Sequence, residues 1–149
     1  MIKTQISGVE FHSSIEFSQP LKAGLDAYLL TYPKNVNPEE EKMSITLVFL
    51  SAIAQKQMGM NDAELLRYVK TTFFAVSASG KPITKSILNK DIVGELLEKK
   101  IPTPSILEVF LLPLNNSDKI IIGFNYTLPF TGDAQKIISE IAASLKETK

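Results

Sequence analysis

Residues 106–128 read ILEVFLLPLNNSDKIIIGFNYTL, and this stretch decides the class of fold. Two apolar runs, 106–112 and 120–128, flank the turn-forming residues 115–118. Alternate positions of the second run are large and apolar: Ile120, Ile122, Phe124, Tyr126 and Leu128. This alternation places all five side chains on one face of a strand, whereas a helix would scatter them. The stretch therefore predicts an antiparallel hairpin with one face on a hydrophobic core.

Further strands are predicted upstream of this hairpin. Residues 44–50, Ser-Ile-Thr-Leu-Val-Phe-Leu, are apolar on both alternating faces, which favours the middle of a sheet covered on both sides. The other predicted strands are Leu25–Tyr32, which stops at Pro33, a short strand or hairpin from Gly8–Phe11 and Ile15–Phe17, and two weaker candidates at Ile83–Leu88 and Ile92–Glu98. The polar run Asn35–Lys42 is expected to be a loop.

Two amphipathic helices are predicted. Asn61 and Glu64 have the spacing of a capping box, and Met60 and Leu65 have that of a hydrophobic staple, so a helix is expected over residues 61–75. A second apolar stripe runs through Ala134, Ile137, Ile138, Ile141, Ala142 and Leu145, with Thr131 or Asp133 as the expected N-cap.

This order of elements predicts an α+β sandwich. Each helix can bury its apolar stripe only against a face of the sheet, and a parallel sheet would require helices between most of its strands. The composition changes nowhere along the chain, so residues 1–149 are expected to form a single domain.

Charge and composition argue against several classes of protein. Sixteen basic residues balance sixteen acidic ones, and Arg67 is the only arginine, so no clustered basic surface for nucleic acid is expected. No apolar run is long enough for a membrane span. The N-terminus lacks the apolar core of a secretory signal, which predicts a cytoplasmic protein as the chain is written, or an extracytoplasmic one if it is a trimmed mature domain.

No catalytic or cofactor-binding motif is found in the sequence. The glycines are too dispersed for a phosphate-binding loop, and the chain has no cysteine. His12 could act as a base or a metal ligand, but a lone imidazole makes a poor zinc site. The acidic groups Glu39–Glu41, Asp91 with Glu95, and Asp62 with Glu64 are better explained by solvated loops, turns and first-turn helix electrostatics. We therefore expect no enzyme, no cofactor and no metal site.

Residues 54–60, Ala-Gln-Lys-Gln-Met-Gly-Met, join the central strand to the first predicted helix. Met58 and Met60 could line a groove, because methionine adapts readily at contact surfaces. Both side chains could equally pack in the core, and the staple position of Met60 favours that alternative.

The chain resembles the Mog1/PsbP-like superfamily in the order of its elements. The resemblance covers the segment ending in Tyr32-Pro33, the helix from Asn61, the hairpin 106–128 with its Leu112-Pro113-Leu114 corner, and the last helix. It implies an α/β/α sandwich around an antiparallel sheet, with no established enzymatic activity as a property of the class. Members of the superfamily are accessory proteins, including photosystem II subunits, a small-GTPase binder, envelope lipoproteins and adaptor chaperones of secreted effectors.

Two functions are consistent with these patterns. The first is a non-enzymatic accessory or protein-interaction module that binds another protein, with the partner and the oligomeric state left open. The alternative is a small-ligand-binding domain or an undescribed enzyme, with a pocket at a helix–sheet margin near Tyr32, Met58 and Met60.

Overall fold

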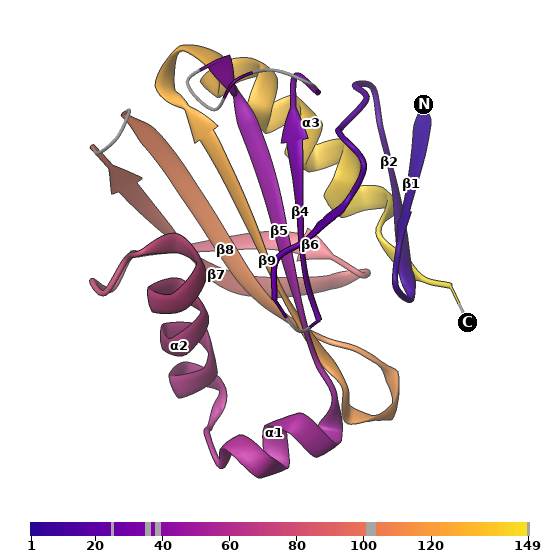
Figure 1. The fold of residues 1–149 in the computed structure, drawn as a ribbon, viewed down its shortest axis with the longest axis vertical. Helices are drawn as coiled ribbons and strands as arrows, with labels where there is room; N and C mark the ends of the chain where they lie inside the picture. Colours follow the sequence, from indigo (N-terminus) through magenta and orange to yellow (C-terminus); the bar gives the residue numbers. More distant parts are fainter. Residues whose placement is uncertain (25, 35–36, 38–39, 101–103, 149) are drawn as a thin grey trace.

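A seven-stranded antiparallel sheet forms the middle layer of the chain, in the order β3-β4-β5-β9-β8-β7-β6 (Figure 1). The computed structural model describes residues 1–24, 26–34, 37, 40–100 and 104–148. The strands of this sheet are β3 (Leu21–Lys22), β4 (Ala27–Tyr32), β5 (Met43–Leu50), β6 (Lys81–Ile87), β7 (Lys90–Lys99), β8 (Ser105–Pro113) and β9 (Lys119–Thr127). Every neighbouring pair in it is antiparallel, which confirms the predicted α+β class.

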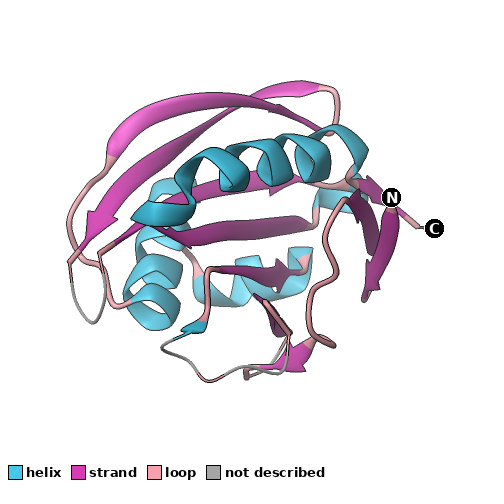
Figure 2. Ribbon diagram, turned by 90° about the horizontal axis from the view of Figure 1, so that it is seen from above, coloured by secondary structure: helices cyan, strands magenta, loops and turns pink. Residues whose placement is uncertain are grey.

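Helices cover both faces of this sheet. Helices α1 (Ala52–Met58) and α2 (Asp62–Phe74) lie on one side, and α3 (Thr131–Ser144) lies on the other, which completes the expected α/β/α sandwich (Figure 1). A small second sheet of β1 (Ile2–Ile6), β2 (Val9–Ser13) and β10 (Lys146–Glu147) packs beside α3, close to both chain termini (Figure 2).

The decisive hairpin forms as predicted, with one change at its end. Residues 115–117 form the short 3-10 helix η2 in its turn, and Leu112 pairs with Ile120 across it. The first four alternating side chains of β9 are buried. Leu128, the fifth, is exposed and begins the 3-10 helix η3 (Leu128–Phe130), because Pro129 cannot donate to the ladder.

The N-terminal prediction was wrong in its pairing. The expected strand from Gly8 does form, as β2, but its hairpin partner is β1, upstream of it. Ile15–Phe17 lies outside any strand, although Phe17 is buried. The ring of Phe17 makes edge-to-face contacts with Phe11 and Tyr32. Phe17 is therefore part of the hydrophobic core although it does not lie in a strand.

The helix signals were confirmed at α2 and corrected elsewhere. Asn61 caps α2 and forms the full capping box with Glu64. Residues 54–60 were expected only as a junction, but residues 52–58 form α1, which ends at Gly59 in the left-handed conformation. The N-cap of α3 is Phe130, so neither Thr131 nor Asp133 has that role; the Thr131 hydroxyl instead donates to the Leu128 carbonyl.

The sheet separates two hydrophobic clusters. The α3 side holds the larger cluster, which includes Leu30, Ile45, Phe110, Ile122 and Ile138. The α2 side holds the smaller one, which includes Val48, Leu65, Val69, Phe74 and Val109. Strand β5 contributes to both clusters, which confirms the predicted cover on both of its sides, and it lies inside the sheet, next to the middle strand β9.

Some predicted segments fall outside the described residues. These are Leu25 at the start of the second predicted strand, residues 35–36 and 38–39 of the predicted loop, and with them Glu39 of the acidic run. Among the residues that are described, none of the helices has both the length and the apolar composition needed to cross a membrane.

Candidate functional site

The three side chains proposed from sequence as contacts lie on opposite faces of the sheet. Tyr32 packs on the α3 side, where its ring stacks on Phe130 with 5.8 Å between centroids. Met58 and Met60 pack against the α2-side cluster. The sheet lies between the two groups, so the expected single pocket around these three residues does not form.

Met60 and the outer face of α2 enclose a shallow hollow. Its lining residues follow one side of the helix: Met60, Glu64, Arg67, Tyr68, Thr71 and Thr72. Tyr68 stands there with 45% of its surface exposed, a large fraction for an aromatic side chain. Arg67 is the only arginine of the chain, and tyrosine and arginine are residue types that often dominate the energy of protein interfaces.

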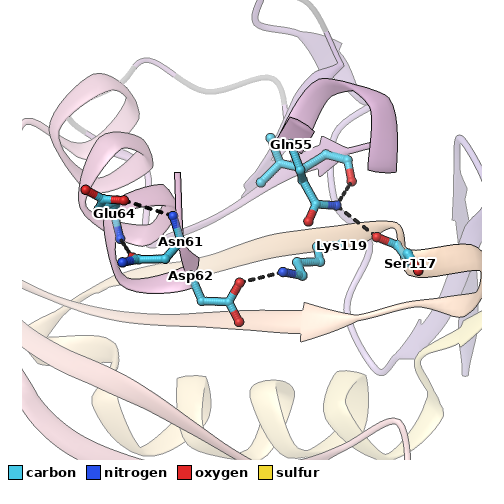
Figure 3. Close-up of polar contacts among 7 residues, drawn as sticks. Gln55, Asn61, Asp62, Glu64, Ser117 and Lys119 are labelled. Carbon is cyan, nitrogen blue, oxygen red and sulfur yellow. Dashed lines mark hydrogen bonds and ion pairs between the residues drawn. The ribbon is translucent and has the colours of Figure 1, made fainter. Parts of the chain in front are cut away.

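Helix α1 continues this helical layer and is held mainly by polar contacts. None of its residues is buried, and Ile53 is 70% exposed. The Gln55 side-chain amide donates to the carbonyls of Leu50 and Ser117, at 2.9 and 3.0 Å, which ties α1 to the end of β5 and to the β8–β9 turn (Figure 3). The Asp118 carboxylate accepts from the amide of Ala52.

The start of α2 is fixed in the same way. The Lys119 ammonium of β9 pairs with the Asp62 carboxylate, and Asn61 and Glu64 exchange hydrogen bonds in the capping box (Figure 3). Asp62 and Glu64, a candidate acid pair from sequence, therefore both have structural contacts. We refer to the exposed side chains Ile53, Arg67 and Tyr68, together with the half-buried Met60, as the α1–α2 surface.

A separate pocket of about 270 Å³ opens at one end of the sheet, where five chain segments meet. It is lined by Ser7 and Gly8 of the β1–β2 turn, Asp26, Phe49–Ser51 at the end of β5, Leu114, Asp118 and Lys119 of the β8–β9 hairpin, and Glu147 of β10. We call it the sheet-end pocket. The sequence contains no motif that predicts it, because its residues are far apart in the chain and most belong to turns.

The carboxylates of the sheet-end pocket come from different segments of the chain. The Asp118 carboxylate accepts from the Ala52 amide at 2.9 Å, and the Glu147 carboxylate accepts from the Asn115 amide at 3.0 Å. Within the described part of the chain, no three acidic or histidine side chains gather closely enough to hold a metal ion. The carboxylates are therefore spread over different walls and do not converge on one point.

A buried polar network lies beneath α3. The Tyr126 hydroxyl donates to the Glu108 carboxylate at 2.7 Å, and the Gln135 side-chain amide donates to both, at 2.6 and 2.7 Å. The Lys85 ammonium is 3.7 Å from the other carboxylate oxygen. Burial and the hydrogen bond to Glu108 raise the pKa of the Tyr126 phenol, so this phenol stays protonated in the folded chain.

The remaining sequence candidates make ordinary structural contacts. His12 lies in β2, where its backbone amide donates to Ser144 of α3. Glu95 pairs with Lys70 and accepts from the Gly80 amide. Burial by itself would raise the pKa of Glu95, but these two hydrogen bonds lower it below the ordinary value. Glu41 has a raised pKa because of its burial.

The comparisons with known proteins identify a fold and no close relative. No family model matches the sequence, and a search among curated proteins finds no match. Among solved structures, a Bacteroides thetaiotaomicron protein superposes with a TM-score of 0.55 at 12% identity over 95% of this chain. This chain spans 45% of that protein's length.

Two further solved structures are similar over most of both chains. One is the Saccharomyces cerevisiae Ran-binding protein Mog1p, with a TM-score of 0.52 at 10% identity, covering 98% of this chain and 95% of that one. The other is LpqN of Mycobacterium tuberculosis, which is involved in cell envelope biogenesis, with a TM-score of 0.51 at 9% identity, covering 95% and 83%. The chain thus has the Mog1/PsbP-like fold, as its order of elements predicted.

Proposed function

We propose that this chain is a non-enzymatic protein-interaction module and that its partner binds the α1–α2 surface. The observation that carries the proposal is a helical layer that exposes large side chains. Helix α1 buries none of its residues, and Ile53 and Tyr68 extend into solvent. Exposed tyrosine and arginine side chains that line one hollow, as Tyr68 and Arg67 do, are typical of protein contact sites.

The contacts of α1 support this proposal. A helix of seven residues is too short to be stable alone, and this one is held by Ser51, Gln55 and Asp118. These contacts present Ile53 in a fixed orientation on the outside of the layer. A rigid display of this kind lowers the entropy lost on binding.

The similar structures are consistent with the same proposal. Mog1p is a Ran-binding protein, so the fold serves protein recognition in at least that case. We extend only the class of activity to this chain, since function does not follow from fold. Met60 belongs to the proposed contact surface, while Tyr32 and Met58 do not.

The experiment compares protein capture by the native chain and by two surface variants. The double variant Ile53→Ser, Tyr68→Ala removes the exposed apolar groups of the proposed surface. Val93→Ser is the matched control, because Val93 on β7 is 68% exposed, close to the 70% of Ile53. Circular dichroism melts of all three proteins establish that each is folded.

We expect one or more proteins from the native source to be captured by the native chain and the control, and lost with the double variant. Capture that is unaffected by the double variant would place the interface elsewhere. Turnover of a substrate that one point substitution abolishes would overturn the proposal that the module is non-enzymatic.

A further inference from the structure

The sheet-end pocket combines an apolar wall with carboxylates on several sides. Phe49, Leu50 and Leu114 supply the apolar part. Asp26, Asp118 and Glu147 supply the negative charge, each from a different turn or strand end. The volume of about 270 Å³ lies near the lower end of the usual range for small-molecule sites.

The balance of charge in the pocket is negative. Among the described residues that line it, Lys119 is the only cationic one, and the ammonium of Lys119 is paired with Asp62, which lies outside the pocket. Asp26 is exposed and makes no side-chain hydrogen bond or ion pair with any described residue. The field inside the pocket therefore favours a positively charged guest.

The spacing of the carboxylates indicates the kind of cation. A metal ion needs several oxygens at one point, and the described acidic side chains do not provide such a group. An alkylammonium or guanidinium group directs several N–H donors outward from an apolar chain. Such a group can reach carboxylates on different walls while its chain packs against Phe49 and Leu114.

We propose that the sheet-end pocket binds an alkylammonium or guanidinium group, carried either by a free amine or by a lysine or arginine side chain of a partner protein. The proposal does not depend on the α1–α2 surface, because none of the residues that define that surface lines the pocket. Either inference can fail without the other.

The test is an amide-shift titration of the full chain by NMR at low salt, because exposed charges are screened as salt increases. The probes are butylammonium, butylguanidinium and the neutral isostere butanol, each added to about 20 mM, since weak small-ligand sites bind in the millimolar range. We expect the two cations to shift the amides of Ser7, Gly8 and Phe49 in a saturable way. Butanol should shift them far less.

Matched variants test whether the carboxylates of the pocket bind the cation. Asp26→Asn and Glu147→Gln should each weaken butylammonium binding about threefold, the size expected for a partly exposed charge pair. Asp91→Asn, which removes an exposed carboxylate on β7 outside the pocket, should leave it unchanged. Equal shifts with butanol, no saturable shift with either cation, or binding by both pocket variants as tight as that of the native chain would each overturn the proposal.

A second pair of probes separates the two sources of the cation. Putrescine represents a free amine, and the capped peptide acetyl-Gly-Lys-Gly-amide represents a side chain of a partner. Tighter binding of putrescine assigns the pocket to a small amine, and equal or tighter binding of the peptide assigns it to a protein side chain. Failure of both probes to compete with butylammonium would contradict the proposed site.

Discussion

Gly123 shows how a single residue sets the distance between α2 and the sheet. A Cβ atom at this position would lie 2.3 Å from the ring of Phe74, the last residue of α2. The absence of a side chain therefore allows Phe74 to pack directly over β9. No other residue type fits this position without moving that ring.

We expect Gly123→Ala to lower the free energy of unfolding by about 1–3 kcal/mol, the usual cost of overpacking a core. Urea denaturation followed by circular dichroism measures the change. Gly132→Ala is the control, because a Cβ at Gly132 in α3 meets no atom within 4 Å and alanine favours a helix. Equal stability of Gly123→Ala and the native chain would show that Phe74 moves aside freely.

Tyr126, on the same strand, takes part in a buried hydrogen-bond network. Its hydroxyl and the Gln135 amide both donate to the buried carboxylate of Glu108, which is 2% exposed. Tyr126→Phe removes one of these donors, so we expect a loss of about 1–3 kcal/mol at neutral pH. Chemical denaturation of both proteins gives this difference.

The pH dependence of that difference follows from the raised pKa of Tyr126. Above the ordinary tyrosine value of 10.0, the unfolded chain loses the phenolic proton while the folded chain keeps it, so the unfolded state gains stability. From neutral pH to about pH 10, the advantage of the native chain over Tyr126→Phe should be constant, and above that pH it should shrink. A constant difference up to pH 11 or so would contradict the assigned environment.

At the scale of elements, the connection from α2 to β6 depends on one ion pair. Lys70 of α2 is buried, and its ammonium contacts the Glu95 carboxylate of β7 at 2.6 Å and the Ala78 carbonyl at 3.1 Å. Glu95 also accepts from the Gly80 amide at 2.8 Å. The pair thus anchors the helix and the following turn to the same strand.

Glu95→Gln should destabilise the chain by about 2 kcal/mol, because it leaves the Lys70 ammonium buried without a carboxylate. The pKa of Glu95 is lowered in the folded state, so its contribution is complete above the ordinary value of 4.5 and is lost as the pH falls through the folded value. Denaturation at pH 7 and at about pH 3 tests this.

The matched control for Glu95→Gln is Glu98→Gln on the same strand, where the side chain is exposed and makes no ion pair with a described residue. If Glu95→Gln and Glu98→Gln changed the free energy of unfolding equally at both pH values, the stability of the chain would not depend on the pairing of Lys70 with Glu95.

At the scale of the whole molecule, one sheet carries two cores. Leu65 of α2 and Ile138 of α3 are both fully buried, on opposite faces of strands shared by the two clusters. Since the two faces belong to the same strands, loss of either helix exposes one face of strands that also carry the other cluster. We expect the two layers to unfold together.

Leu65→Ala and Ile138→Ala should each cost about 2–5 kcal/mol and shift a single transition. Far-ultraviolet circular dichroism follows the helices, and near-ultraviolet signals of the tyrosines follow the packing. Coincident curves in both variants are the expected result. Two separated transitions in either variant would show that the layers are independent.

The sequence determined the parts of this protein that depend on neighbouring residues. The alternation along Ile120–Tyr126 specified a strand and its buried face, and Asn61 with Glu64 specified where α2 begins. These signals work because side-chain direction and capping act over a few residues. The order of the elements was enough to indicate the Mog1/PsbP-like fold.

Only the tertiary structure decided how the distant parts meet. It placed Tyr32 and Met60 on opposite faces of the sheet and paired β2 with β1. It also brought Asp26 and Glu147 to one pocket. These relations depend on which strands are neighbours and on which turns meet at the same end of the sheet. The contacts join segments that are far apart in the chain, so no local pattern of residues can predict them.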